Sequence, residues 1–179
     1  MEDFIFELKI PKERIAILIG KNGEIKKQIE ESTNTQLEID SKEGDIFITG
    51  KDGLDIFSAK QIIRAIGRGF NPELALLLLK PDYSFELVDI SEFAKSKNSI
   101  IRLKGRVIGK EGKSRKTIER LTECYISVYG KTIGIIGKIE YAQNAKKAVE
   151  ILLKGGNHAN IFRSLENKRR QLRQRELQG

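Results

Sequence analysis

The amino-acid sequence predicts an α+β protein built from two homologous domains in tandem. The chain of 179 residues contains the related stretches "LIGKNGEIKKQI" and "VIGKEGKSRKTI". Each of these stretches contains a first glycine, at position 20 or 109, and a further glycine lies downstream of it, at position 50 or 137. Such similar spacing indicates a duplicated unit. We expect a first domain at residues 1–80, a second at 81–167, and a basic C-terminal tail at 168–179.

Each copy is expected to follow the order β-α-α-β-β-α. A strand with apolar residues at every second position opens the copy. One helix then leads into the glycine loop and another leaves it. Two strands joined by a short turn follow, at 35–40 with 45–50 and at 124–129 with 132–137. The apolar positions of the closing helices are Ile56, Ala59, Ile62, Ile63 and Ile66 in copy one, and Ala142, Ala145, Ala148, Val149 and Leu152 in copy two.

One added helix follows each copy. The closing helices are expected to end at glycines that adopt a left-handed cap. Asn71 or Asn157 then offers an N-cap for the added helix. The stretch "PELALLLL" at 72–79 is apolar nearly all round, which predicts that it is buried against the other copy. On this interpretation the added helices hold the two domains together as one rigid unit. The capping glycines are Gly67, Gly69, Gly155 and Gly156.

The composition limits the possible function classes. No apolar run approaches the roughly 20 residues of a membrane span, and the first residues are unlike a secretory signal, so we expect a cytoplasmic protein without a membrane partner. The single cysteine, Cys124, excludes an internal disulfide and a cysteine-rich metal site. With His158 as the single histidine, most familiar nucleophilic or metal sites cannot be assembled. Cys124 is expected to be a buried small hydrophobe, and His158 a cap or surface residue. We expect a monomer with no enzyme activity, no metal and no cofactor.

The net charge of +8 comes from the second half of the chain. Residues 1–80 hold 12 Lys/Arg against 14 Asp/Glu, whereas residues 81–179 hold 21 against 11. Basic residues that neutralise phosphates release counterions, so this excess favours a polyanion partner over a merely solvated face. Near the C-terminus, six basic residues stand against Glu166 and Glu176, which slightly favours loose phosphate contacts by the tail over a solvated helical end without a partner. These six are Arg163, Lys168, Arg169, Arg170, Arg173 and Arg175.

The glycine loop of each copy lies where a helix begins. Backbone N–H groups at such a helix start are unpaired, and the positive end of the helix dipole attracts anions. We expect glycine at both ends of the loop because a Cβ there would hold a phosphodiester backbone away. Lys21-Asn22 stand between the glycines in copy one and Lys110-Glu111 in copy two. Repetition of the motif in the same context indicates that it binds a nucleic-acid backbone.

These residues resemble the signature of KH domains of type I, the eukaryotic-type topology. The resemblance implies that each G-x-x-G loop clamps the backbone of about four single-stranded nucleotides. It also implies an apolar groove for the bases, lined by Ile19, Ile25 and Ile39 in copy one and by Ile108 and Val128 in copy two. The RNA-binding residues expected on this basis are Ile19, Gly20, Lys21, Asn22, Gly23, Arg106, Ile108, Gly109, Lys110, Glu111, Gly112, Lys113, Ser114, Arg115 and Lys116.

The second copy resembles most closely the ribosome-assembly group of KH proteins, which contains Partner-of-Nob-One and its archaeal relatives. The resemblance rests on "GRVIGKEGKSRKTIERLT" together with "IGIIGKIEYAQNAKKAVEILLKGG". It implies binding to the 3′ region of small-subunit (16S-type) ribosomal RNA during ribosome assembly and rRNA processing. It also implies contacts with the rRNA-processing endonuclease and with the alpha subunit of initiation factor two. The eukaryotic members lack the first glycine loop, which is intact here, as expected of an archaeal-type protein.

Charge favours the second copy as the main RNA clamp. Residues 102–120 carry eight Lys/Arg against two Glu, and the matching stretch of copy one is far more balanced. We expect the first copy to tune register or to contact a protein. Two other functions stay open, namely a KH-type subunit of an RNA-degradation complex and a protein-interaction scaffold. An RNA-cleaving enzyme is disfavoured, because the acidic cluster at 40–45 falls on a predicted turn.

Overall fold

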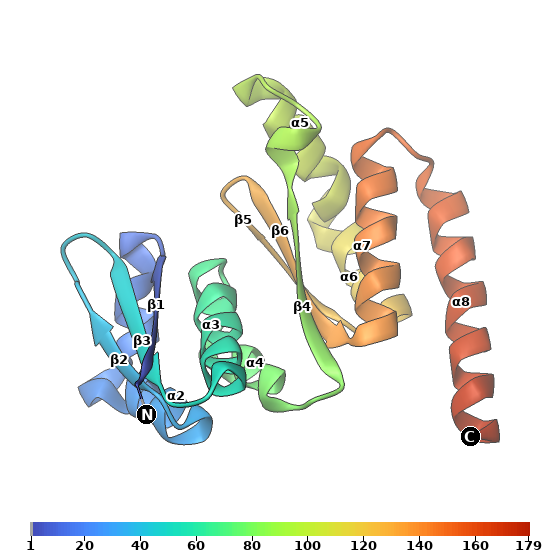
Figure 1. Cartoon of the computed structure of the whole chain (residues 1–179). Helices are drawn as coiled ribbons and strands as arrows, with labels where there is room; N and C mark the ends of the chain where they lie inside the picture. Colours follow the sequence, from blue (N-terminus) through green and yellow to red (C-terminus); the bar gives the residue numbers. More distant parts are fainter. Residues whose placement is uncertain (1) are drawn as a thin grey trace. The chain divides into compact units, whose positions relative to one another are not determined.

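The computed structural model describes residues 2–179, and the chain divides into two compact units between Tyr83 and Ser84. Each unit combines a three-stranded sheet with several helices (Figure 1). The α+β class and the tandem arrangement of two similar domains expected from the sequence are therefore confirmed. The domain limits expected at 80/81 and 167/168 stay a sequence-based proposal.

The first unit follows the expected element order. Its sheet has β3 in the centre, with β1 and β2 antiparallel to it on either side. Ile48 of β3 stands opposite Phe6 of β1 and Leu37 of β2. The elements are β1 (Phe4–Lys9), α1 (Ile15–Ile19), α2 (Glu24–Thr33), β2 (Gln36–Ile39), β3 (Asp45–Gly50), α3 (Gly53–Gly67) and α4 (Pro72–Ala75), the last continued by a 3-10 turn at Leu76–Leu79.

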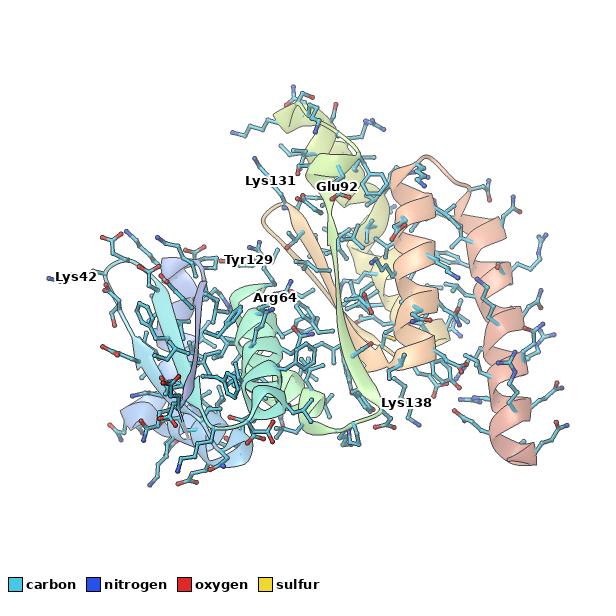
Figure 2. All side chains as sticks on the ribbon, viewed as in Figure 1. Lys42, Arg64, Glu92, Tyr129, Lys131 and Lys138 are labelled. Atoms are coloured by element: carbon cyan, nitrogen blue, oxygen red, sulfur yellow. The ribbon has the colours of Figure 1, made fainter. Side chains whose placement is uncertain are left out.

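The second unit repeats this plan with a longer first helix and a long final helix. Its sheet has the order β4-β6-β5, and β5 is antiparallel to β6. The elements are β4 (Tyr83–Asp89), α5 (Lys97–Ile108), α6 (Lys113–Thr122), β5 (Tyr125–Tyr129), β6 (Thr132–Lys138), α7 (Ile139–Leu153) and α8 (His158–Gln178). The hairpin turns of the two units carry Lys42 and Lys131, which both point away from the sheets (Figure 2).

The core of each unit lies between its sheet and its helices. All ten apolar positions expected on the closing helices α3 and α7 are buried, so that prediction is confirmed. They meet central-strand residues that are fully buried, such as Ile46 and Ile48 in the first unit and Ile133 and Ile135 in the second. Cys124 is buried as expected, and burial raises the pKa of its thiol to about 12. The thiol therefore stays protonated and acts as a small apolar group.

Glycine and asparagine end one helix and begin the next, as the sequence predicts. Gly69 and Gly155 take left-handed conformations, with φ of +101° and +98°. The Oδ1 of Asn71 accepts from Leu74 N at 2.9 Å, and the Oδ1 of Asn157 accepts from Asn160 N at 3.1 Å. Each asparagine thus satisfies one otherwise unpaired N–H group of the added helix.

The two added helices differ greatly in length. In the first unit, α4 and its 3-10 turn pack on α3, and Leu79 remains 40% exposed. In the second unit, α8 packs on α6 and α7 of the same unit through the buried Ile161 and Leu165. Figure 1 shows α8 in red on the side of α7 that faces away from the sheet. The union of the two domains into one rigid body stays a prediction.

The expected tail is the second half of α8, which continues without a break to Gln178. Among residues 2–179, no helix is both long enough and apolar enough to span a membrane.

Candidate nucleic-acid interface

The two glycine loops have nearly identical backbones. The φ and ψ angles are 75° and 176° at Gly20 and 74° and 174° at Gly109. Asn22 and Glu111 both have φ of 56°, in the left-handed region. In each loop the N–H of the second glycine donates to the carbonyl oxygen of the first at 3.2 Å. The G-x-x-G motif therefore specifies one conformation, and it does so twice.

The glycines at the two ends of each loop serve different purposes. A Cβ on Gly20 would lie 2.5 Å from Ile25 Cγ1, and a Cβ on Gly109 would lie 2.6 Å from Ser114 Cβ. The first glycine is therefore needed so that the following helix can pack against the loop. A Cβ on Gly23 would meet nothing within 4 Å, and its surroundings are open. Only this second position agrees with the expectation that glycine leaves room for a partner backbone.

Apolar side chains flank both loops at intermediate exposure. Ile19 and Ile108 end the helices that enter the loops, and Val128 lies on β5. Half-buried apolar side chains beside a backbone-binding loop suit the unstacked bases of a single strand, which need an apolar surface. The residues with this intermediate exposure are Ile19, Ile25, Ile39, Ile108 and Val128. All five stay candidate groove residues.

The helices that leave the loops differ in charge. α2 begins with Glu24, whereas α6 begins with Lys113. Neither helix has a side-chain cap among the described residues. The N–H of Glu24 donates to the carbonyl of Lys21, and the N–H of Lys113 donates to the carbonyl of Lys110, so a ligand can meet only the N–H groups that follow in the first turn. An acidic side chain at a helix start competes with an anion for these groups, and a lysine reinforces them. We therefore expect the second loop to be the better anion site.

The exposed lysines of the second loop region are Lys110, Lys113 and Lys116. Arg115 is held differently, because its Nη1 donates to Glu119 Oε1 at 2.8 Å. The other oxygen of Glu119 accepts from Ile126 N at 2.9 Å, so this carboxylate also fixes the start of β5.

Arg106, one of the expected RNA contacts, also forms hydrogen bonds within the protein. Its Nε donates to the carbonyl of Leu152 at 2.9 Å, and one terminal nitrogen donates to the carbonyl of Gly156. In the first unit Arg14 donates in the same way to the carbonyls of Ile66 and Phe70, both at 2.8 Å. In each unit an arginine thus bonds to the end of the closing helix, from the 3-10 turn before α1 in the first unit and from α5 in the second.

Replacement of Arg106 by alanine is expected to destabilise the second unit by about 2–4 kcal/mol, because hydrogen bonds to a charged group contribute about 1.5–3 kcal/mol each but do not add fully. Arg106→Lys should restore little, since an ammonium group cannot reach two carbonyls in a fixed fork. Urea unfolding measures both effects. The exposed Arg102 of the same helix provides the control variant Arg102→Ala. Equal stability of Arg106→Ala and Arg102→Ala would contradict this role.

The structure adds residues to the loop region that the sequence did not indicate. His158 and Phe162 of α8, with Gly105 of α5, line a pocket next to Lys110 and Lys113. His158 was expected as a cap or surface residue, but it is half-buried, and its Nε2 donates to the carbonyl of Arg106 at 2.9 Å. Their position depends on the packing of α8 against α6, which no local sequence pattern specifies.

Most of the basic residues expected to extend the RNA footprint along α8 face carboxylates. Arg169 and Arg173 lie 3.7 and 3.6 Å from the two oxygens of Glu123. Arg175 lies 3.7 Å from Glu140, and Arg170 lies 3.7 Å from Glu166. The pairs with Glu123 and Glu140 link α8 to the rest of the second unit, whereas the Arg170–Glu166 pair lies within α8. Together the pairs leave less excess positive charge on α8 than the sequence count suggests.

Two β-α-α-β-β-α units, each with a G-x-x-G loop between its first two helices, define a protein of the tandem KH class. Comparison with models of known protein families also identifies two KH domains. A KH-domain model matches residues 5–65. A model of the second KH domain of PNO1, described as a eukaryotic-type KH domain (KH-domain type I), matches residues 84–170.

Similar proteins were found among both sequences and structures. The KH domain-containing protein MJ0443 of Methanocaldococcus jannaschii is 52% identical over 170 residues, which are 93% of this chain and 74% of that protein. RNA-binding protein pno-1 of Caenorhabditis elegans is 31% identical over 121 residues, 65% of this chain and 43% of that protein. A chain in the crystal structure of the a/eIF2alpha-aDim2p-rRNA complex from Pyrococcus horikoshii OT3 superposes with a TM-score of 0.87 at 39% identity, covering 94% of this chain and 96% of that chain.

The chain belongs to the KH-domain family, and its second KH domain is of the PNO1 type. KH domains are RNA-binding modules that hold single strands with the G-x-x-G loop.

Proposed function

We propose that this protein binds the 3′ region of small-subunit ribosomal RNA during ribosome assembly, without catalysing a reaction, and that the second KH domain is the main clamp. The observation that carries the proposal is the second loop. This loop has the same backbone conformation as the first loop. It differs in charge, because it contains Lys110 and the helix after it begins with Lys113. The named relatives support the ribosomal context, since one is an RNA-binding protein and another is part of a complex with rRNA.

Two protein partners belong to the same proposal. The alpha subunit of initiation factor two is supported by the similar chain in the complex of a/eIF2alpha, aDim2p and rRNA. The rRNA-processing endonuclease rests on the sequence resemblance alone. A non-catalytic factor that binds near a cleavage site would act by holding the RNA in a defined position for such an enzyme.

Fluorescence anisotropy with a labelled single-stranded RNA tests the ribosomal assignment. One RNA matches the 3′ end of small-subunit rRNA, and the control has the same composition in scrambled order. We expect a clear preference for the matching strand that persists as salt is raised, because base contacts depend on salt less than phosphate contacts. Equal binding of both strands would leave a general RNA-binding protein and overturn the ribosomal assignment.

The contribution of the tail is tested by deletion of residues 168–179. If Lys168 and its neighbours touch phosphates, the deletion should weaken RNA binding and lower the slope of log affinity against log salt by about 0.7 for each lost contact with a single strand. The carboxylate pairs of this segment predict a small decrease, of about one contact. Urea unfolding of the deleted protein separates loss of RNA contacts from loss of α8 docking. An unchanged slope would exclude the tail from the RNA footprint.

A further inference from the structure

The first strand of the first domain, β1, lies at an open edge of its sheet. The sheet order is β1-β3-β2, so β1 has a neighbouring strand on one side only. Ile10 N donates to the carbonyl oxygen of Gly44, directly before β3, at 3.1 Å. Because the backbone groups of successive residues alternate in direction, the N–H and C=O groups of Ile5, Glu7 and Lys9 point away from β3. An open row of such groups can pair with another strand.

Apolar side chains are exposed along this open edge. They belong to β1 and to α3, the helix that contacts β1, and their residues are 54–76% exposed. Among residues 2–179, Ile101 and Leu177 are the only other large apolar residues that are exposed by more than half. We call the four residues of this group the β1-edge surface, and they are Phe4, Ile5, Leu54 and Phe57.

The exposed residues of α3 lie over β1. Lys60 of α3 places its Nζ 4.6 Å from the centre of the Phe6 ring. Phe57 lies one turn before Lys60 on the same side of the helix, and Leu54 lies one turn before Phe57. Phe4 has the same face of β1 as Phe6, because side chains of a strand alternate between faces.

The start of α3 lies over the Phe4 end of the strand. Gly50 stands opposite Phe4, and a Cβ on Gly50 would lie 3.3 Å from Ile56 Cγ1. Phe4 and Phe57 are therefore parts of one apolar surface, and Ile5 extends it to the other face of the strand. A continuous exposed apolar surface is typical of a site that binds another molecule.

The second domain carries polar groups at the corresponding positions. "FIFEL" in β1 aligns with "YSFEL" in β4, and the buried positions of α3 align with those of α7. All four corresponding residues have a hydroxyl, carboxylate or amide group. The fold therefore does not require apolar residues at these positions. The corresponding pairs are Phe4 and Tyr83, Ile5 and Ser84, Leu54 and Glu140, and Phe57 and Gln143.

We propose that the β1-edge surface binds a second copy of this chain, and that the two β1 strands pair antiparallel about a two-fold axis. The two three-stranded sheets then form one continuous sheet. Closed two-fold dimers are the commonest oligomers of soluble proteins. The proposal goes beyond RNA binding and does not rest on it, and it replaces the monomer expected from the sequence.

The residues of β1 are complementary to themselves in one register. A two-fold axis perpendicular to the sheet sets side chains of the same face opposite each other, so it passes beside one residue of the strand. With the axis at Phe6, Phe6 faces its copy, Phe4 faces Leu8, and Asp3 faces Lys9. Aromatic and aliphatic pairs on one face, and opposite charges on the other, both stabilise paired antiparallel strands.

The neighbouring registers bring like charges together. An axis at Ile5 would set Asp3 opposite Glu7, and an axis at Glu7 would set the two copies of Glu7 opposite each other. Like charges directly opposite each other destabilise a strand pair. With the axis at Phe6, Glu7 faces Ile5 instead, and the outward N–H and C=O groups of these two residues bond to each other. An axis at either end of the strand would leave half of it unpaired.

Sedimentation equilibrium of the full chain tests the association. Concentrations run from about 1 µM to about 1 mM, since an interface built on one strand pair and a few side chains belongs to the weak class. We expect a reversible equilibrium between monomer and dimer without larger species, because a two-fold interface is closed. A monomer at every concentration would overturn the proposal and leave the β1-edge surface to a different protein. Assembly beyond the dimer would also contradict it.

The second domain supplies variants that should keep the fold. Ile5→Ser and the double variant Leu54→Glu/Phe57→Gln introduce its residues, and each should raise the dissociation constant of the dimer more than about tenfold by loss of apolar contact. Ile101→Glu, at a similarly exposed apolar residue of α5, is the matched control and should leave the constant unchanged. Circular dichroism checks the fold of each variant. Unchanged association of both β1-edge variants would place any dimer interface elsewhere and refute the proposal.

An exchange of charges tests the register. Asp3→Lys sets two lysines opposite each other and Lys9→Asp sets two aspartates opposite each other, so each should weaken the dimer about threefold to tenfold. The combined variant Asp3→Lys/Lys9→Asp restores opposite charges and should recover the association of the original chain. Lys9 Nζ also lies 3.7 Å from Asp45 in its own sheet, so urea unfolding of each variant separates a loss of stability from a loss of association. A combined variant that associates no better than the single ones would contradict the pairing of β1 with β1 at Phe6.

Discussion

Gly20→Ala is expected to destabilise the first domain by about 3 kcal/mol or more, from backbone strain and overpacking together. The φ and ψ angles of 75° and 176° at Gly20 belong to a region that only glycine adopts readily. A Cβ there would also lie 2.5 Å from Ile25 Cγ1 and 2.9 Å from Ile25 N. The neighbouring helix cannot move away without losing the buried Ile29 from the core.

Gly23→Ala provides the contrast within the same loop. Its backbone is left-handed, with φ of 75° and ψ of 14°, and a Cβ would meet nothing within 4 Å. The cost should therefore be limited to the left-handed conformation, about 1–2 kcal/mol. Urea unfolding followed by circular dichroism compares the two variants, and Gly109→Ala with Gly112→Ala repeats the comparison in the second domain. Equal costs at the two ends of a loop would contradict the separate roles assigned to these glycines.

The double variant Lys110→Asp/Glu111→Asp is expected to lower RNA affinity by more than tenfold. A charge-assisted hydrogen bond to a phosphate contributes about 1.5–3 kcal/mol, and an aspartate at position 110 also repels the strand. The backbone should be kept, since position 111 has φ of 56° and aspartate tolerates this region. Anisotropy over a range of salt concentrations measures the affinity and should show a salt slope lower by about 0.7.

The matched variant Lys21→Asp/Asn22→Asp changes the first loop, which has the same backbone. Its effect should be smaller, because α2 begins with Glu24 and Lys27 lies 3.9 Å from Glu31, so that this helix carries less net positive charge. Circular dichroism checks that both variants remain folded. A larger loss of affinity from the first loop than from the second would refute the ranking of the two domains.

Much of this architecture could be predicted from the sequence because the patterns are local and occur twice. The apolar spacing of α3 and α7, the left-handed glycines and the asparagine caps each depend on neighbouring residues alone. The glycine loops could be recognised for the same reason. A single G-x-x-G motif is a weak signal because it often occurs by chance. Its occurrence in both copies, between the same predicted elements, makes it a strong one.

The parts that could not be predicted depend on contacts distant in sequence. Arg106 stays a predicted RNA contact, and the structure adds that its guanidinium binds carbonyls 46 and 50 residues away. His158 came close to the loop only because α8 folds back onto α6. Charge counts also misjudged α8, where Glu123 and Glu140 pair with arginines that looked unopposed in the sequence. Periodicity carries no information about such packing.

Amide chemical shifts during a titration with single-stranded RNA test most directly whether the second loop is the main clamp. The RNA matches the 3′ end of small-subunit rRNA, and the protein is the full chain. We expect the first shifts at residues 108–116 and at Val128, with residues 19–26 responding only at higher RNA concentration. Shifts that begin at residues 19–26, or that avoid both loops, would contradict the account.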